Sequence, residues 1–150
     1  MSRWMVYQTS PLAPKEPSLH TRAMPLVCID IRKGHSPKYK RVILDGVHAA
    51  LIEGFKIPDR DRQQILREHS PEDFEGRGAA PTMVSITAFS GRSREAKRAL
   101  FEAIARNLAA SPGIDENDLL VTANDLPLDN WGIRGGKQAS DLDLGFKIDV

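Results

Sequence analysis

Residues 24–41 of the chain read MPLVCIDIRKGHSPKYKR, and residues 81–98 read PTMVSITAFSGRSREAKR. The two stretches match without a gap when the sequence is shifted by 57 positions. The match continues beyond them and gives nine identical pairs, the last of which is Asp61 with Asp118. An internal duplication explains this agreement better than chance, and two copies are too few for a solenoid.

Each copy has the pattern of a strand, a helix and a second strand. Short apolar runs rich in β-branched residues predict the first strands at Pro25–Ile31 and Met83–Phe89. Ser36 and Ser93 are typical helix N-caps, and each precedes an amphipathic segment. The helices should end near Gly54 and near Ser111-Pro112-Gly113, and the second strands are placed at about Gln63–Arg67 and Asp118–Thr122.

These elements predict one α+β domain over residues 24–150, with repeat one at about 25–68, repeat two at about 82–125 and a C-terminal segment at 126–150. A strand, a helix and a parallel strand take a right-handed crossover, so both helices should lie on one face of a four-stranded sheet. The other face needs a cover, and another subunit is the most economical one. Alternating apolar and polar residues over 142–150 predict a half-buried strand that could pair with a neighbouring chain.

The composition excludes several classes of protein. Lysine and arginine number 21 against 20 aspartate and glutamate, so the net charge of +1 gives no overall attraction to nucleic acid or an anionic membrane. The single cysteine, Cys28, permits no intrachain disulfide and is expected to be a small buried apolar residue. No apolar run reaches the roughly 20 residues of a transmembrane helix. We expect a cytoplasmic protein.

Four short motifs resemble the tautomerase superfamily. They are Met24-Pro25 at the head of an apolar strand, IPDRDR at 57–62, Gly91-Arg92-Ser93 before the second helix, and NWGIRGG at 130–136. The fused, two-copy chains of the 4-oxalocrotonate tautomerase-like fold are the most similar, malonate semialdehyde decarboxylase especially. The resemblance implies a homotrimer that needs no metal or organic cofactor and whose catalytic group is an amino-terminal proline.

The resemblance implies that Pro25 is the catalytic residue, after removal of Met24. Its free secondary amine would act as base and acid on a small carboxylate substrate. Model α-amino groups titrate near pH 7.7–8.0, so modest tuning suits such an amine to proton transfer. Asp61 would tune this amine. The structural alternative is that Asp61 is only a turn residue before a strand.

The remaining site residues would bind the substrate. Arg92 would hold its carboxylate through paired hydrogen bonds and stabilise enolate charge, with Arg94 in support. The structural alternative is that both arginines lie in a solvated loop and bind nothing. Trp131 and Ile133 would form an apolar wall that excludes water, although a tryptophan in such a setting is more often a core residue. Arg134, in a glycine-rich turn, is expected to be solvated.

The proposed chemistry requires a chain that begins at Pro25, because an internal proline nitrogen belongs to a tertiary amide and has no basic lone pair. Residues 1–23 contain three prolines among polar residues and predict a disordered leader or a mis-assigned start. Either translation begins at Met24, or the leader is cut, or the activity has been lost. We favour the first, since repeat, strand and motif all begin at Pro25.

Three functions remain open. Keto–enol isomerisation of a small 2-oxo acid or enol is the leading interpretation. Decarboxylation is the alternative on the same site, but Arg92 and Arg94 are shifted against the helix relative to malonate semialdehyde decarboxylase-like chains, and Ile133 replaces an aromatic residue. A ferredoxin-like module that binds a small anion without turnover is the interpretation if Pro25 stays internal. An RNA-binding sheet is disfavoured, because the central strands lack paired aromatic residues.

Overall fold

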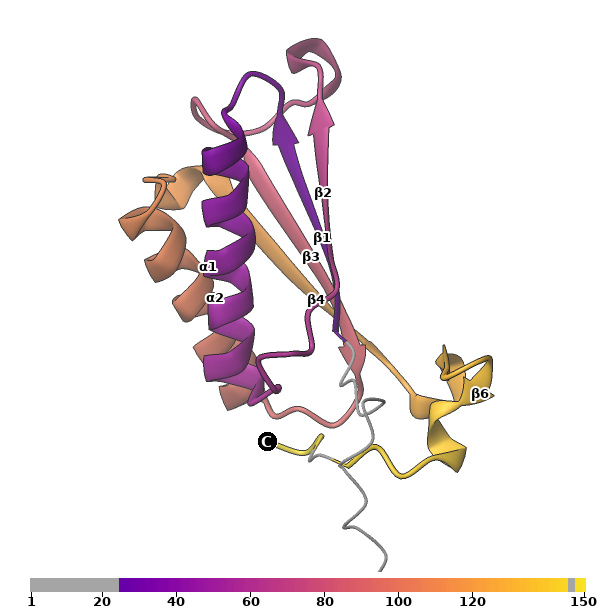
Figure 1. Cartoon of the computed structure of the whole chain (residues 1–150). Helices are drawn as coiled ribbons and strands as arrows, with labels where there is room; N and C mark the ends of the chain where they lie inside the picture. The colour runs from indigo at the N-terminus through magenta and orange to yellow at the C-terminus, as the bar shows by residue number, and fades with distance from the viewer. Residues whose placement is uncertain (1–24, 146–147) are drawn as a thin grey trace, which may run out of the picture.

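The computed structural model describes residues 25–145 and 148–150. The expected leader, residues 1–23, lies outside the described residues and stays a prediction. In the described part the chain forms a sheet of four strands and two long helices, shown in chain order in Figure 1. Their bounds are β1 Pro25–Arg32, α1 Pro37–Phe55, β2 Gln64–His69, β3 Thr82–Phe89, α2 Arg94–Ala110 and β4 Leu119–Leu126.

The sheet has the strand order β2-β1-β3-β4. β1 pairs parallel with β2, β3 pairs parallel with β4, and the central pair β1–β3 is antiparallel. Both helices cover the same face of the sheet, to its left in Figure 1. The predicted α+β fold of two β-α-β units is therefore confirmed.

The duplication is visible in the central strand pair. Cys28 of β1 faces Ser85 of β3, and these residues are 57 positions apart, which is the spacing of the sequence repeat. The two units are thus related by an approximate twofold axis through this pair. As a result, the start of β1 lies beside the end of β3.

Both helices begin where the sequence predicted. The side-chain oxygens of Ser36 and Ser93 each accept a backbone N–H three residues further on, at 3.1 Å in both cases. These bonds satisfy donors that the first helical turn leaves unpaired. Gly34 and Gly91, two residues before the caps, have φ angles of 112° and 126°, which favour glycine. The two connections therefore repeat one local design.

The core lies between the helices and the inner face of the sheet. Burying each large aliphatic side chain contributes about 1.5–3 kcal/mol. The valine, isoleucine and leucine side chains with at most 1% exposure are Val27, Ile29, Ile31, Val84 and Ile86 from the strands, and Ile43, Val47, Leu51, Leu100, Ile104 and Leu108 from the helices. The helices approach closely at Gly54, where an added Cβ would lie 2.8 Å from the Cα of Leu100.

The second strands of both units run further than predicted. β2 covers 64–69 rather than 63–67, and β4 covers 119–126 rather than 118–122. β4 pairs with the whole of β3, up to Phe89 with Leu126. Its last residues include Asn124 and Asp125, which disfavour strands by intrinsic propensity. Both are exposed on this edge strand, so pairing with β3 overrides the propensity.

A small C-terminal cluster covers the end of β3. Its buried members are Phe89, Trp131, Ala139 and Leu144. A short hairpin of β5 (Gly132–Ile133) and β6 (Lys137–Gln138) was not predicted, and it stands away from the helices in Figure 1.

A strand was predicted over 142–150, but the described residues of that range, 142–145 and 148–150, form no strand within the single chain. The Asp143 carboxylate accepts the N–H of Gly145 at 3.0 Å, and this local turn bends the chain. Leu144 is 6% exposed and packs in the C-terminal cluster. Pairing of this segment with a neighbouring chain stays a prediction.

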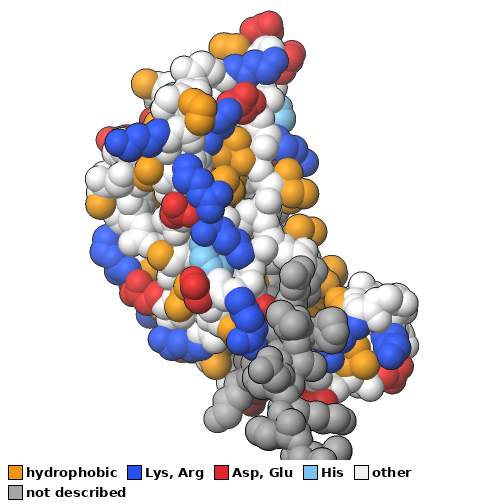
Figure 2. Space-filling view, viewed as in Figure 1, with side chains coloured by type: hydrophobic (Ala, Val, Ile, Leu, Met, Phe, Trp, Pro, Cys, Tyr) orange, Lys and Arg blue, Asp and Glu red, His pale blue; other side chains and the backbone are white. Residues whose placement is uncertain are grey.

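The face of the sheet opposite the helices is open in the single chain. Ile65 and Leu120 are 51% and 57% exposed on it, and hydrophobic side chains are visible along the sheet side in Figure 2. Cys28 also lies on this face and is half-buried rather than buried, because its neighbours Val27 and Ile29 take the inner positions. Elsewhere in Figure 2, basic and acidic side chains are mixed, as the balanced composition predicts.

An ion network occupies the same open face. Asp30, 17% exposed at its side chain, accepts hydrogen bonds from Arg67 Nε at 2.9 Å and from His69 Nε2 at 2.7 Å. Burial alone would raise the pKa of Asp30, but the hydrogen bonds and charges of Arg67 and His69 outweigh it and hold the pKa below its ordinary value.

We predict that Gly54→Ala lowers the free energy of unfolding by about 1–3 kcal/mol, because the new Cβ meets the backbone of Leu100. Gly46→Ala is the matched control in α1, since its Cβ would meet the flexible end of Leu108 at 3.1 Å. Urea unfolding monitored by circular dichroism measures both variants. Equal effects of the two substitutions would contradict a backbone clash at Gly54.

We also predict that the pKa of the Asp30 carboxyl in the folded protein, measured by NMR, lies below the ordinary value of an aspartate. A depressed pKa contributes stability above the unfolded-state value, and this stability is lost as the pH falls through the folded value. The stability difference between the wild type and Asp30→Asn should therefore shrink in acid. Arg67→Met should raise the pKa of Asp30, and no change in that variant would refute the assigned cause.

Candidate active site

The fold brings three of the predicted site residues to one end of the sheet. Pro25 is buried at the start of β1 and faces Ala88 near the end of β3. The loop after β3 carries Arg92, and the loop before β2 carries Asp61. The second loop is tied to β1, because the N–H of Val27 donates to the carbonyl oxygen of Gln63 at 3.1 Å.

Arg92 is buried with two of its donors unused. The residue is 5% exposed, and its Nη1 donates to the carbonyl oxygen of Phe89 at 3.0 Å. Its guanidinium carbon lies 4.6 Å from the centroid of the Phe55 ring, a cation–π contact. Nε and Nη2 are shielded from solvent and have no hydrogen-bond partner.

Burial changes the electrostatics of this guanidinium. Desolvation lowers the pKa of Arg92, and the charge of Asp125 opposes the shift only in part. An unpaired buried cation is costly, so such a group favours a bound anion. Nε and Nη2 lie on one edge of the guanidinium, and their two N–H groups match the two oxygens of a carboxylate.

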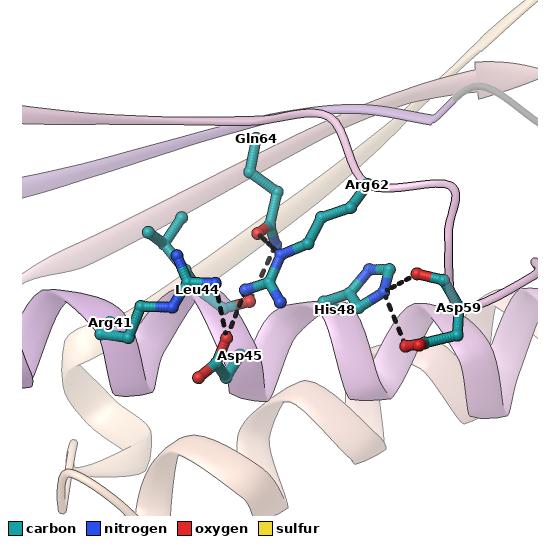
Figure 3. Close-up of polar contacts among 7 residues, drawn as sticks. All are labelled: Arg41, Leu44, Asp45, His48, Asp59, Arg62 and Gln64. Atoms are coloured by element: carbon teal, nitrogen blue, oxygen red, sulfur yellow. Dashed lines mark hydrogen bonds and ion pairs between the residues drawn. The ribbon is translucent and has the colours of Figure 1, made fainter. Parts of the chain in front are cut away.

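Asp61 is 2% exposed, which is more burial than an ordinary turn residue has. The loop that carries it is held against α1 by the polar contacts drawn in Figure 3. His48 Nε2 donates to the carbonyl oxygen of Asp59 at 2.8 Å, and Arg62 bonds to Asp45 and Gln64. The hydrogen bond from Arg62 holds the pKa of Asp45 below its ordinary value.

His48 was not predicted to have this role, although it is 4% exposed. Because a carbonyl oxygen only accepts hydrogen bonds, Nε2 carries the proton in this contact. The sequence signal was a histidine on the apolar side of a helix, and only the fold shows that a loop 11 residues further on lies beside it.

The remaining predicted residues occupy different surroundings. Trp131 is 8% exposed, makes an edge-to-face contact with Phe89 at 4.9 Å, and donates from its indole to the carbonyl oxygen of Leu126 at 3.3 Å. Ile133 packs on the same C-terminal cluster. Phe89 links this cluster to Arg92, because its ring contacts Trp131 and its carbonyl oxygen accepts the hydrogen bond from Arg92. Arg94 is exposed in the first turn of α2, so the structure does not bring it together with Arg92 in the single chain.

The described residues contain neither a side-chain group suited to hold a metal ion nor a helix suited to span a membrane. Within 25–145 and 148–150, no three His, Cys, Asp or Glu side chains are grouped so as to hold a metal ion. Over the same residues, neither helix is long and apolar enough to cross a bilayer.

Comparison with known proteins identifies the family. Residues 25–80 and residues 61–134 each match a family model described as tautomerase enzyme. Over 123 residues the chain is 30% identical to the probable tautomerase YrdN of Bacillus subtilis, covering 76% of this chain and 94% of the relative. The chain belongs to the tautomerase family.

Solved tautomerase structures have the same fold. The Q0 fused 4-OT, a symmetric trimer, is 30% identical with a TM-score of 0.70, over 77% of this chain and 96% of its own. The FG41 malonate semialdehyde decarboxylase inhibited by 3-bromopropiolate is also 30% identical with a TM-score of 0.70, over 78% and 97%. The resemblance to fused tautomerases is thus confirmed, and this tautomerase is an enzyme of that general type.

We predict that His48→Phe lowers the free energy of unfolding by about 0.5–1.5 kcal/mol, because the Asp59 carbonyl loses its donor. Asp59→Ala should cost less, since its carboxylate is 92% exposed and lies 3.4 Å from His48 Nε2. Chemical unfolding of both variants measures the difference. A larger loss in Asp59→Ala would mean that the carboxylate, not the carbonyl, holds the loop.

Proposed function

We propose that this tautomerase catalyses keto–enol isomerisation of a small 2-oxo acid or enol, with the free amine of Pro25 as base and acid. The observation that carries the proposal is the guanidinium of Arg92, which is buried and keeps the Nε–Nη2 edge unpaired. A site with such an edge favours a ligand that bears a carboxylate. The buried start of β1 lies at the same end of the sheet.

The proposed reaction moves protons only. In the ketonisation direction the Pro25 amine accepts the proton of the enol hydroxyl, and the resulting secondary ammonium returns a proton to the neighbouring carbon. The electron pair of the broken O–H bond forms the carbonyl, and the electron pair of the carbon–carbon double bond forms the new C–H bond, so the substrate is neither oxidised nor reduced. Arg92 would hold the carboxylate and stabilise the enolate charge between the two transfers.

The other proposed residues act around this centre. Asp61, buried in the loop before β2, would tune the amine, since a nearby carboxylate favours its charged form. Trp131 and Ile133 would supply the apolar wall through the C-terminal cluster. Arg94 lies exposed one residue beyond the N-cap of α2, where it would support an acidic ligand by charge rather than by burial.

Decarboxylation is the second candidate. It is favoured by the 30% identity to a malonate semialdehyde decarboxylase over 78% of this chain. Both reactions would use the same proline and arginine, and they differ in whether a carbon–carbon bond breaks. Release of carbon dioxide from malonate semialdehyde distinguishes them.

We further propose that the active form is a homotrimer, as the related Q0 fused 4-OT is. The open face, on which Ile65 and Leu120 are more than half exposed, is the surface that neighbouring subunits would cover. Light scattering during size exclusion measures the number of chains.

Turnover should require an unblocked proline. We expect a chain that begins at Pro25 to ketonise phenylenolpyruvate, measured by absorbance. The same chain with residues 1–24 attached should show no rate above buffer, because its proline nitrogen is acylated. Activity of both forms would refute the proline mechanism, and activity of neither would favour a module that binds anions without turnover.

Within the active form, we predict that Arg92→Ala lowers kcat/KM at least about tenfold, the effect of losing a charged hydrogen bond worth roughly 1.5–3 kcal/mol. Arg98→Ala removes the same charge from an exposed position of α2 and should leave the rate nearly unchanged. Steady-state kinetics on the Pro25-initiated chain measure both. An unaltered rate in Arg92→Ala would remove Arg92 from the site.

A further inference from the structure

Arg134, expected from sequence to be solvated, has shielded nitrogens instead. Its Nη1 donates to the carbonyl oxygen of Asp143 at 3.1 Å, while Nε and Nη2 are buried and unpaired. Arg92 has the same arrangement, with Nη1 on the Phe89 carbonyl and the same edge unpaired. In the described part of the chain, these are the arginines with buried nitrogens that lack a partner.

The carboxylate of Asp143, the residue that Arg134 contacts, does not pair with this edge. Asp143 offers Arg134 its backbone carbonyl, whereas its carboxylate accepts the N–H of Gly145. Among the described residues no carboxylate pairs with Arg134, and its Nε and Nη2 are shielded although the residue as a whole is half-buried. Each buried unpaired donor costs free energy, so the arrangement favours an anion from outside the chain.

The backbone gives a second, independent indication. Arg134, Gly135 and Gly136 have successive φ angles of 48°, 83° and 86°. Arginine is a side chain that disfavours this region, and strained residues of this kind concentrate at functional sites. A Cβ added to either glycine would meet no atom within 4 Å, so open space lies beside the turn.

We propose that Arg134 and the turn 134–136 form a second anion site, separate from Arg92, that binds the carboxylate of a small organic acid. The Nε–Nη2 edge presents two parallel N–H groups, which match a planar carboxylate better than a spherical halide. A small acid also fits the limited access to these shielded atoms better than an acidic side chain on the surface of another protein.

The test is a titration of the full chain with sodium acetate, followed by the arginine Nε–H cross-peaks in NMR spectra. The peak absent in Arg134→Lys identifies Arg134. We expect this peak to shift saturably with acetate, and sodium chloride at equal ionic strength to leave it in place. The amide peaks of Gly135 and Gly136 should show at least about tenfold weaker binding in Arg134→Lys, which keeps the charge but loses the paired donors.

Lys137→Gln is the matched control, because Lys137 is an exposed cation of the same hairpin. It should retain acetate binding. No saturable shift, an equal response to chloride, or equal loss of binding in Lys137→Gln would overturn the proposal. A change of oligomeric state in Arg134→Gln but not in Lys137→Gln would also overturn it, since the partner would then be an acid of a second copy.

The same spectra separate this proposal from the proposed function. A response of the Arg92 peak alone would overturn the second site and leave the isomerase proposal standing. A response of the Arg134 peak alone would support the second site and count against Arg92 as the carboxylate-binding residue.

Discussion

The antiparallel pairing of β1 with β3 is the constraint on which the rest of the structure depends. The register that puts Cys28 opposite Ser85 aligns the start of one strand with the end of the other. Each strand then takes a parallel neighbour from its own unit. The start of β1, the loop before β2 and the loop before α2 thereby meet at one end. A shift of one residue would turn the inner face of β1 outward and remove the core together with the site.

The state of Arg92 explains why this end of the sheet suits an acid. The Phe89 carbonyl fixes one nitrogen and the Phe55 ring lies against the guanidinium, so the side chain is oriented before any ligand arrives. Desolvation of the buried guanidinium lowers the pKa of Arg92, and the charge of Asp125 offsets this only in part. A carboxylate bound to the free edge would replace the hydrogen bonds with water that the guanidinium loses on burial. A lysine could not replace Arg92, because its single ammonium group cannot bond the Phe89 carbonyl and also present two coplanar N–H donors to a carboxylate.

The features that sequence predicted are the ones set by local chemistry. Ser36 and Ser93 cap helices because their hydroxyls reach a backbone N–H within one turn, and the inner residues of β1 and β3 alternate because strands have a period of two. The features that sequence missed depend on contacts between distant segments. β4 continues through Asn124 and Asp125 only because β3 lies beside it. The turn at Leu144 and the contact of His48 likewise require surfaces that no local pattern contains.

The chain uses charge in two opposite ways. On the open face, Asp30 meets Arg67 and His69 within hydrogen-bonding distance, so these charges are already paired beside the exposed side chain of Ile65. Covering a paired network costs less than covering isolated charges, and such a face tolerates a protein partner. Arg92 instead has a free Nε–Nη2 edge that is buried and unpaired. A stable contact with a protein partner would not leave these donors unpaired, because buried polar groups in proteins are hydrogen-bonded. The same physical rule therefore supports both proposals, that the open face is covered in the trimer and that the end of the sheet binds a ligand.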